Sequence, residues 1–321
     1  MGVRFSLPAP KYIMSETKKS PLLVILGPTA VGKSDLAIKI SKWIARKKIG
    51  GYKGAEIISA DSRQVYRSLN IGTGKITKKE MARIPHHLLD VANPKKQFAA
   101  AQYKRLAEKA IKKIITDKKI PIICGGAGFY IQAITENISI PEVKPDAKLR
   151  AILEKKSTKE LFNQLKKFDP RRAKNIDKNN RRRLIRALEI IIKSGKKVPE
   201  LKSAPKYEAL IIGVKRGSRE LKESIKTRLL KRFKMGMVKE VINLKKSGLS
   251  WKRLEDFGLE YRYIAYYLQN KLSYDEMIKK LQKEIENYAK RQMTWFTRDK
   301  KIRWVADFKQ AKKIIKEFLS D

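Results

Sequence analysis

The chain has 321 residues, of which 76 are Lys or Arg and 32 are Asp or Glu, so its formal charge is +44. Its apolar runs, such as residues 22–26 and 120–124, are far shorter than the roughly 20 residues of a membrane-spanning helix, so no membrane attachment is expected. A single cysteine, Cys124, excludes an intrachain disulfide and any zinc site built on several thiolates. It is typical of a reducing compartment, and we expect a cytoplasmic protein.

The excess of positive charge predicts a polyanionic partner. Lys and Arg bind a nucleic-acid backbone by releasing its counterions, whereas a fold needs no such excess and is destabilised by self-repulsion. The alternative is a lysine-rich proteome in which every protein is basic. Charge alone does not decide between these interpretations.

Residues 1–20 lack the long apolar core of a secretory signal, and we expect a disordered leader in which Met14 is an alternative start. Beyond them, strand-like runs alternate with helix-like segments. The strands are expected at 22–26, 55–59 and 120–124, with helices at 32–47 and 99–117 between them. This alternation predicts a parallel sheet flanked by helices.

Residues 137–205 interrupt that alternation with amphipathic helices and polar turns. They contain 20 Lys or Arg against 8 Asp or Glu, so the segment is basic in its own right. We expect an all-helical lobe inserted between two parts of a catalytic core, residues 21–136 and 206–321. The second part of this core is predicted to contain a strand at 209–214, helices at 218–233, 237–247, 261–269 and 273–298, a short strand at 301–306 and a final helix.

Residues 27–34 match the phosphate-binding pattern G-x-x-x-x-G-K-[ST] directly after a predicted strand and at the start of a helix. The glycines let backbone amides surround phosphate oxygens, and the helix N-terminus adds partial positive charge. Lys33 adds a full charge, and the Ser34 hydroxyl is a candidate magnesium ligand. The core is therefore predicted to be a P-loop NTPase-like α/β fold, with phosphate contacts from Gly27, Pro28, Thr29, Ala30, Val31, Gly32, Lys33 and Ser34.

Asp61 is the candidate acidic partner of this loop. It follows the strand at 55–59, and the carboxyl ends of parallel strands share one edge of the sheet. A carboxylate there can accept a proton or bind magnesium through water. The alternative is a helix N-cap aspartate, because Asp is a favoured cap.

With these features in one order, the sequence resembles the tRNA dimethylallyltransferases, also called isopentenyl-tRNA transferases, over nearly the whole chain after residue 20. The resemblance rests on these segments: GPTAVGKS (27–34), DSRQVY (61–66), IGTGK (71–75), PHHLLD (85–90), GGAGFY (125–130), RRRLIRALE (181–189), SRELK and RLLKRF (within 218–233), GLEYR (258–262) and KRQMTWF (290–296).

The resemblance implies that the loop binds the diphosphate of dimethylallyl diphosphate, with Mg²⁺ as the cofactor. N6 of the adenine 3′-adjacent to the anticodon would attack the allylic carbon, and diphosphate would leave. Asp61 is then the general base, and Lys33 stabilises the leaving group. Arg228 or Arg232, four residues apart on one helical face, resembles the family's diphosphate-binding arginine, and we favour Arg228. The alternative is two solvated arginines.

The partner implied is the anticodon stem-loop of tRNA. Arg182 and Arg186 lie one helical turn apart and suit a phosphate-backbone clamp, although a solvated role is the alternative for each basic residue. Ala127 stands where the family commonly has threonine, so a hydroxyl expected near the reacting centre is absent. The tRNA-binding residues implied are Asp61, Ser62, Arg63, Gln64, Ala127, Arg150, Arg182, Arg183 and Arg186.

Two other functions share the phosphate-binding loop. A small-molecule kinase would have the same loop and sheet but would not need the basic insertion. An RNA-binding protein switched by a nucleotide would not need Asp61. We expect a monomer.

Overall fold

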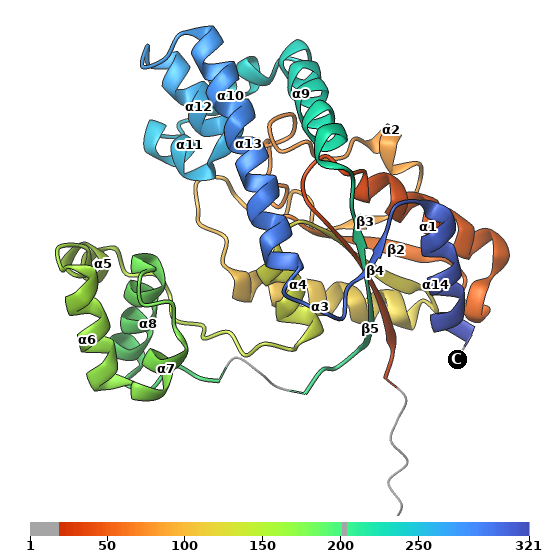
Figure 1. The fold of residues 1–321 in the computed structure, drawn as a ribbon, viewed down its shortest axis with the longest axis horizontal. Helices are drawn as coiled ribbons and strands as arrows, with labels where there is room; N and C mark the ends of the chain where they lie inside the picture. Colours follow the sequence, from red (N-terminus) through yellow and green to blue (C-terminus); the bar gives the residue numbers. More distant parts are fainter. Residues whose placement is uncertain (1–18, 201–203, 321) are drawn as a thin grey trace, which may run out of the picture.

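A parallel six-stranded sheet forms the centre of the computed structural model, which describes residues 19–200 and 204–320 (Figure 1). The strand order is β3-β2-β4-β1-β5-β6, and each pair of neighbours is parallel. The predicted α/β class is confirmed, while residues 1–18 of the expected leader lie outside the described residues. The strands are β1 (Pro21–Leu26), β2 (Ala55–Ala60), β3 (His86–His87), β4 (Ile120–Gly125), β5 (Glu208–Val214) and β6 (Arg303–Val305).

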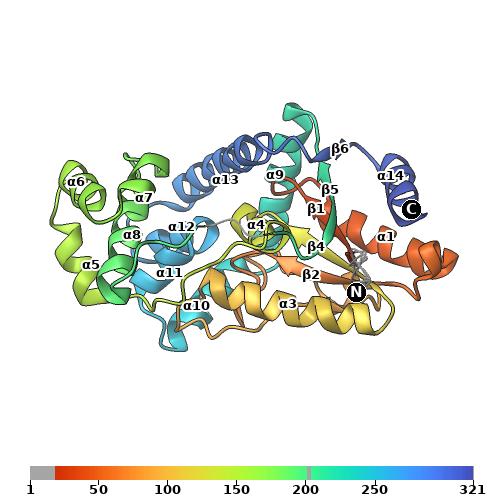
Figure 2. The same cartoon turned by 90° about the horizontal axis from the view of Figure 1, so that it is seen from below.

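The central strands are continuous apolar runs because helices cover both faces of the sheet. Alternate residues of β1 point to opposite sides: Leu22 and Val24 join one buried cluster, and Leu23 and Ile25 join another. Figure 2 shows the two layers on either side of the strands. The core helices before the insertion are α1 (Lys33–Lys47), the 3₁₀ turn η1 (Ile49–Gly51), α2 (Lys78–Met81), α3 (Ala100–Thr116) and α4 (Gly128–Thr135).

The chain after the insertion adds a group of helices above one edge of the sheet (Figure 1). Their shared core also contains Val65, Tyr66 and Leu69, from the segment that follows β2. That segment is therefore fixed between the sheet and these helices. The helices of this group are α9 (Ser218–Lys234), α10 (Met237–Lys246), α11 (Trp251–Phe257), α12 (Leu259–Leu268) and α13 (Tyr274–Phe296). The last helix, α14 (Phe308–Ser320), packs beside α1 on one face of the sheet.

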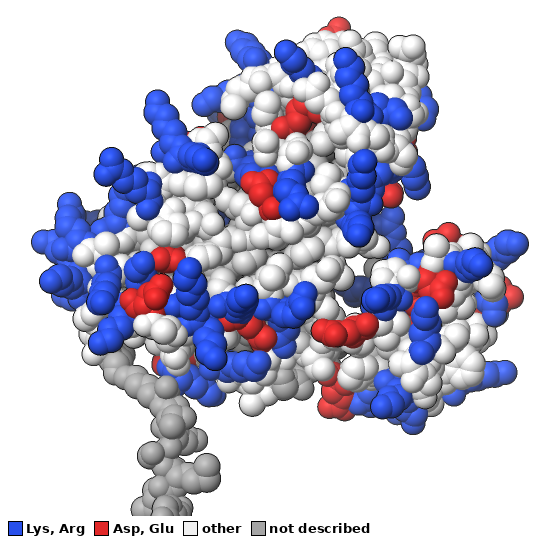
Figure 3. Space-filling model, turned by 180° about the vertical axis from the view of Figure 1, so that it is seen from behind, with Lys and Arg blue, Asp and Glu red and all other residues white. Residues whose placement is uncertain are grey.

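The inserted segment forms a lobe with its own hydrophobic core (Figure 1). Leu184 and Leu188 are fully buried in it, as their spacing on a basic amphipathic helix predicts. On the face in Figure 3, Lys and Arg spread over both the core and this lobe. Its helices are α5 (Ala147–Glu154), α6 (Thr158–Phe168), α7 (Pro170–Asn175) and α8 (Arg181–Ser194).

Five of the described elements were not expected from the sequence: η1, α2, β3, α4 and α11. The edge strand β3 has only two residues, and α11 and α4 are short helices with seven and eight residues. Such short elements carry little periodicity, and tertiary packing decides them. No helix in the described ranges combines the length and apolar character needed to cross a bilayer.

Glu189 of α8 holds the inserted lobe together from inside. Its carboxylate is fully buried and accepts hydrogen bonds from the side chains of Arg150 and Arg186 and from the backbone N–H of Asp146. Burial raises the pKa of Glu189, but these hydrogen bonds outweigh it, and the pKa is lowered overall. The ionised carboxylate therefore stabilises the lobe.

We expect Glu189→Gln to lower the unfolding free energy of the lobe by about 3 kcal/mol at pH 7, because two arginines lose a buried counter-charge. A lowered carboxyl pKa gives stability that is present above the unfolded pKa, about 4.3, and is lost as the pH falls through the folded value. The difference between variant and wild type should therefore shrink below about pH 4. Hydrogen exchange of the α8 amides, followed as a function of pH, measures this difference in unfolding free energy.

The matched control is Glu200→Gln, which removes an exposed ion pair with Arg171 in the same lobe. It should change exchange little, because solvent screens exposed pairs. Equal effects of the two substitutions would contradict the structural role of Glu189.

Candidate active site

The phosphate-binding loop joins β1 to α1 at the carboxyl edge of the sheet. Gly27 and Gly32 have φ values of +148° and +89°, a region in which a side chain is strained. A Cβ on Gly27 would also lie 2.5 Å from the carbonyl oxygen of Val214 in β5. Both glycines are therefore required by the loop's conformation, and Gly27 is also required by its close approach to β5.

Lys33 is the first residue of α1, and its ammonium group folds back onto the loop to donate to the carbonyl oxygen of Pro28. Burial, with a smaller contribution from the positive charge of Arg228, lowers its pKa to about 8, although Cys124 and Asp61 act in the opposite direction. Lys33 thus lies close enough to Arg228 and Asp61 to be affected by their charges. Such a partly desolvated ammonium is suited to an anionic ligand.

Gln292 of α13 fixes the loop from the other side. Its buried side-chain oxygen accepts from the backbone N–H of Thr29 at 2.9 Å, and its nitrogen donates to the carbonyl of Gly126 at 3.0 Å. One amide therefore joins the phosphate-binding loop to the loop after β4. Sequence reasoning missed this role. The only signal was that Gln292 belongs to the segment at 290–296.

Asp61 directly follows β2, as predicted. Its Oδ1 accepts from the backbone N–H of Arg63 at 2.8 Å and of Gln64 at 3.1 Å. It therefore caps a turn rather than a helix, which corrects the N-cap alternative. Within the described part of the chain, Oδ2 has no hydrogen-bond partner, so one oxygen orients the side chain and the other is available.

Arg228 and Arg232 of α9 face the segment at 71–75. A Cβ built on Gly74 would lie 2.2 Å from the Arg228 guanidinium and 1.7 Å from that of Arg232, so both guanidinium groups lie directly against this glycine. Arg232 pairs with the buried Glu260 at 2.9 Å. Burial lowers the pKa of Arg228 to about 10, and Arg232 contributes. Among the described residues Arg228 makes no hydrogen bond or ion pair, which distinguishes the two arginines and favours Arg228 as the ligand-binding one.

Comparison with known proteins agrees with this arrangement. Residues 64–299 match the model of the IPP transferase family. The chain is 38% identical to the tRNA dimethylallyltransferase of Pelotomaculum thermopropionicum over 298 residues, which cover 91% of this chain and 92% of that protein. This chain belongs to the IPP transferase family.

Solved structures agree. The tRNA isopentenylpyrophosphate transferase of Bacillus halodurans superposes with a TM-score of 0.68 at 31% identity, covering 94% of this chain and 96% of that one. A eukaryotic dimethylallyltransferase, described as acting on tRNA, gives a TM-score of 0.71 at 26% identity and covers 91% and 75% of the two chains. The similarity extends through the core and the inserted lobe.

The arginines predicted to bind tRNA fall into two groups in this IPP transferase. Arg182 and Arg183, at the start of α8, are exposed, and within the described ranges their side chains have no ion pair. Arg150 and Arg186 are instead bound to Glu189 inside the lobe. Arg182 and Arg183 can therefore reach a phosphate, whereas Arg150 and Arg186 bind a buried carboxylate of the lobe itself.

The remaining predicted residues surround Asp61. Ser62 lies in the turn that Asp61 caps, and Ala127 donates its backbone N–H to the carbonyl of Ala60 at 3.0 Å. Arg63 donates to the carbonyl of Asp256, and the Gln64 amide donates to the carbonyls of Thr73 and Gly74. Gln64 therefore joins the Asp61 turn to the segment at 71–75, which lies against Arg228 and Arg232.

Ser34 and Asp61 supply oxygen atoms of the kind that Mg²⁺ binds. The described residues contain no group of three or more His, Cys, Asp or Glu side chains placed to hold a metal ion. Ser34 and Asp61 therefore suit a magnesium ion that takes most of its ligands from water and substrate phosphate, as is usual for this ion.

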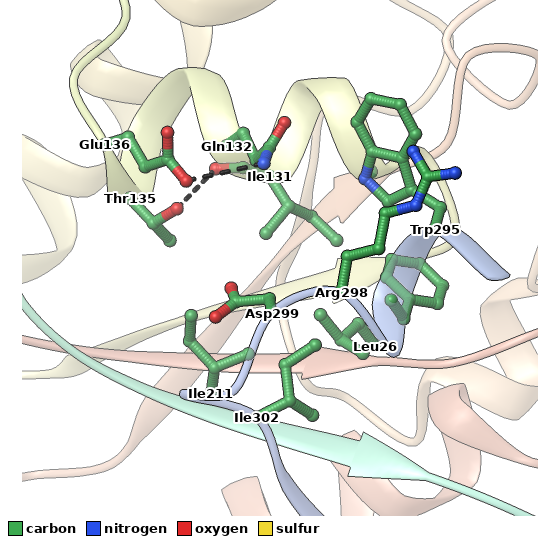
Figure 4. A pocket seen from close by; sticks show the side chains of 12 residues that line it. Leu26, Ile131, Gln132, Thr135, Glu136, Ile211, Trp295, Arg298, Asp299 and Ile302 are labelled. Atoms are coloured by element: carbon green, nitrogen blue, oxygen red, sulfur yellow. Dashed lines mark hydrogen bonds between the residues drawn. The ribbon is translucent and has the colours of Figure 1, made fainter. Parts of the chain in front are cut away.

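A cavity of about 330 Å³ lies between α4 and the end of α13, with Trp295, Glu136 and Asp299 among its lining residues (Figure 4). None of the predicted site residues lines it. We therefore place the candidate active site at the convergence of Lys33 and Asp61 with Arg228, where several charged groups act on one another, rather than in this cavity.

The lowered pKa of Lys33 makes diphosphate binding depend on pH. Lys33 is charged below about pH 8, so pyrophosphate should bind best there and weaken as the pH rises through 8, by up to about tenfold per pH unit. Isothermal titration calorimetry at constant free magnesium measures this.

The control is the Lys33→Arg variant, whose guanidinium stays protonated over the same pH range, and its pyrophosphate binding is measured in the same way. Subtracting its profile removes the titration of pyrophosphate itself. Identical profiles for the two proteins would show that Lys33 does not titrate near pH 8.

Proposed function

We propose that this protein transfers a dimethylallyl group from dimethylallyl diphosphate to N6 of the adenine 3′-adjacent to the anticodon in tRNA, releasing diphosphate. Family membership supports a tRNA prenyltransferase. The observation that carries the proposal is that Lys33, Arg228 and the carboxylate of Asp61 lie close enough for their charges to affect one another, while one Asp61 oxygen has no hydrogen-bond partner among the described residues. The kinase and nucleotide-switch alternatives have no comparable support.

The leaving diphosphate gains negative charge as the allylic C–O bond breaks. Backbone amides of the loop at 27–34, the Lys33 ammonium and the Arg228 guanidinium would stabilise that charge more in the transition state than in the ground state. Partial burial strengthens these interactions because fewer water molecules screen them. A magnesium ion held by Ser34 and substrate oxygens would add further positive charge at the diphosphate.

Asp61 would take the proton from adenine N6 as the C–N bond forms. The amine is a poor nucleophile because its lone pair is delocalised into the ring, so a positioned base lowers the barrier. The free Oδ2 is the acceptor, and the two backbone amides that bind Oδ1 hold the carboxylate in place. The balance is one C–N bond formed, one C–O bond broken and one proton moved to Asp61.

The tRNA must present an adenine that has left its stack, because the allylic carbon cannot reach a base inside the folded loop. We propose that the basic lobe binds the phosphate backbone of the anticodon stem-loop, mainly through the exposed Arg182 and Arg183. Close to the reacting centre, the tRNA contacts would come from Ser62, Arg63, Gln64 and Ala127.

We expect Asp61→Asn to bind tRNA normally and to lose prenyl transfer by about 100-fold or more, because a neutral amide cannot accept the proton. The assay combines purified protein, unmodified tRNA, magnesium and labelled dimethylallyl diphosphate, followed by nucleoside mass analysis. Binding of tRNA is measured in parallel by fluorescence anisotropy.

ATP serves as the control donor in the same assay. Turnover of ATP without prenyl transfer by the wild-type protein would refute the proposal and favour a kinase. Full transfer by Asp61→Asn would refute only the role of Asp61 as the base.

A further inference from the structure

Glu240, in the first turn of α10, binds the segment that lies beneath the two arginines. Its carboxylate accepts from three successive backbone N–H groups, those of Asn70 at 3.0 Å, Ile71 at 2.7 Å and Gly72 at 3.0 Å. It also accepts from the hydroxyl of Tyr261 in α12 at 2.8 Å. One side chain therefore ties together three parts of the chain that are far apart in sequence.

The tied segment, residues 70–75, contacts both sides of the candidate active site. The carbonyl of Gly72 accepts from Arg232, and Gly74 lies against the guanidinium groups of both Arg228 and Arg232. On its other side, the segment accepts the amide of Gln64 from the turn that Asp61 caps. A shift of residues 70–75 would therefore displace both Arg228 and the turn that contains Asp61.

The carboxylate acts together with close packing on this segment: Ile71 packs against the core of the C-terminal helices, and a Cβ on Gly72 would lie 2.7 Å from the Tyr261 ring. A cavity of about 440 Å³ lies beside the segment, lined by Ile71, Glu240 and residues of the first turns of α10. Three adjacent amides need an acceptor with several lone pairs and no protons, which an ionised carboxylate supplies and an amide does not.

We propose that Glu240 is a positioning residue for the diphosphate: it holds residues 70–75 so that Arg228 is placed against the leaving group. The inference rests on the proposed function for its catalytic meaning. Its structural content concerns the binding of a diphosphate, which can be measured without any transfer reaction.

The test is Glu240→Gln, with pyrophosphate as the probe. We expect its Kd to rise by about tenfold, the loss expected when one charge-assisted contact is misplaced, with the KM for dimethylallyl diphosphate rising in parallel. The Kd for tRNA should change less than that for pyrophosphate, because the proposed backbone contacts come mainly from Arg182 and Arg183 of the inserted lobe. Glu240→Asp keeps the acceptor and should recover part of the loss.

Two controls separate positioning from folding. Glu223→Gln makes the same charge change on the exposed face of α9 and should leave pyrophosphate binding unchanged. In an Arg228→Ala background, Glu240→Gln should add little to the Kd, because the residue through which it acts is gone. Partial unfolding would instead lower the active fraction and leave Kd and KM unchanged.

Pyrophosphate binding within about twofold of wild type in Glu240→Gln would overturn the inference, as would full additivity with Arg228→Ala. If the wild-type protein transfers no prenyl group but the pyrophosphate results hold, the proposed function fails and the positioning role of Glu240 stands. If transfer occurs and Glu240→Gln binds normally, only the inference fails.

Discussion

Three parallel strands end at the same level, and the candidate active site depends on this register. Leu26 of β1 and Ala60 of β2 both pair with Gly125 of β4, so the loop that follows each strand starts at one edge of the sheet. A Cβ on Gly125 would lie 2.1 Å from the carbonyl of Ala60, so the close approach requires glycine at this position. The phosphate-binding loop and Asp61 are neighbours because of this constraint.

Charge balance is the second organising feature. Bringing Lys33 and two arginines together costs free energy, and burial and like charges accordingly lower the pKa of Lys33 and of Arg228. Glu260 offsets part of the repulsion by pairing with Arg232. The diphosphate of the proposed donor would balance the remaining positive charge and relieve the repulsion on binding.

The inserted lobe shows a similar division of its arginines. Glu189 binds Arg150 and Arg186 and so builds a charged core, while Arg182 and Arg183 stay at the surface. A net charge of +44 therefore does not mean that every basic residue is available to a polyanion. Arg150 and Arg186, which are bonded to Glu189, stabilise the fold of the lobe, and Arg182 and Arg183 are exposed on its surface.

The sequence by itself determined the parallel core, the phosphate-binding loop, the place of Asp61 after a strand and the helical, basic nature of the insertion. These depend on local patterns: apolar runs, a glycine-rich spacing and helical periodicity. Only the tertiary structure decided that Gln292 and Glu240 hold the loops of the site, that Arg232 pairs with Glu260 while Arg228 has no ion pair among the described residues, and that Glu189 binds two arginines. Apart from the Arg186–Glu189 pair, which lies within α8, these contacts join segments that lie far apart in the chain, and no local pattern in a single sequence records such pairings.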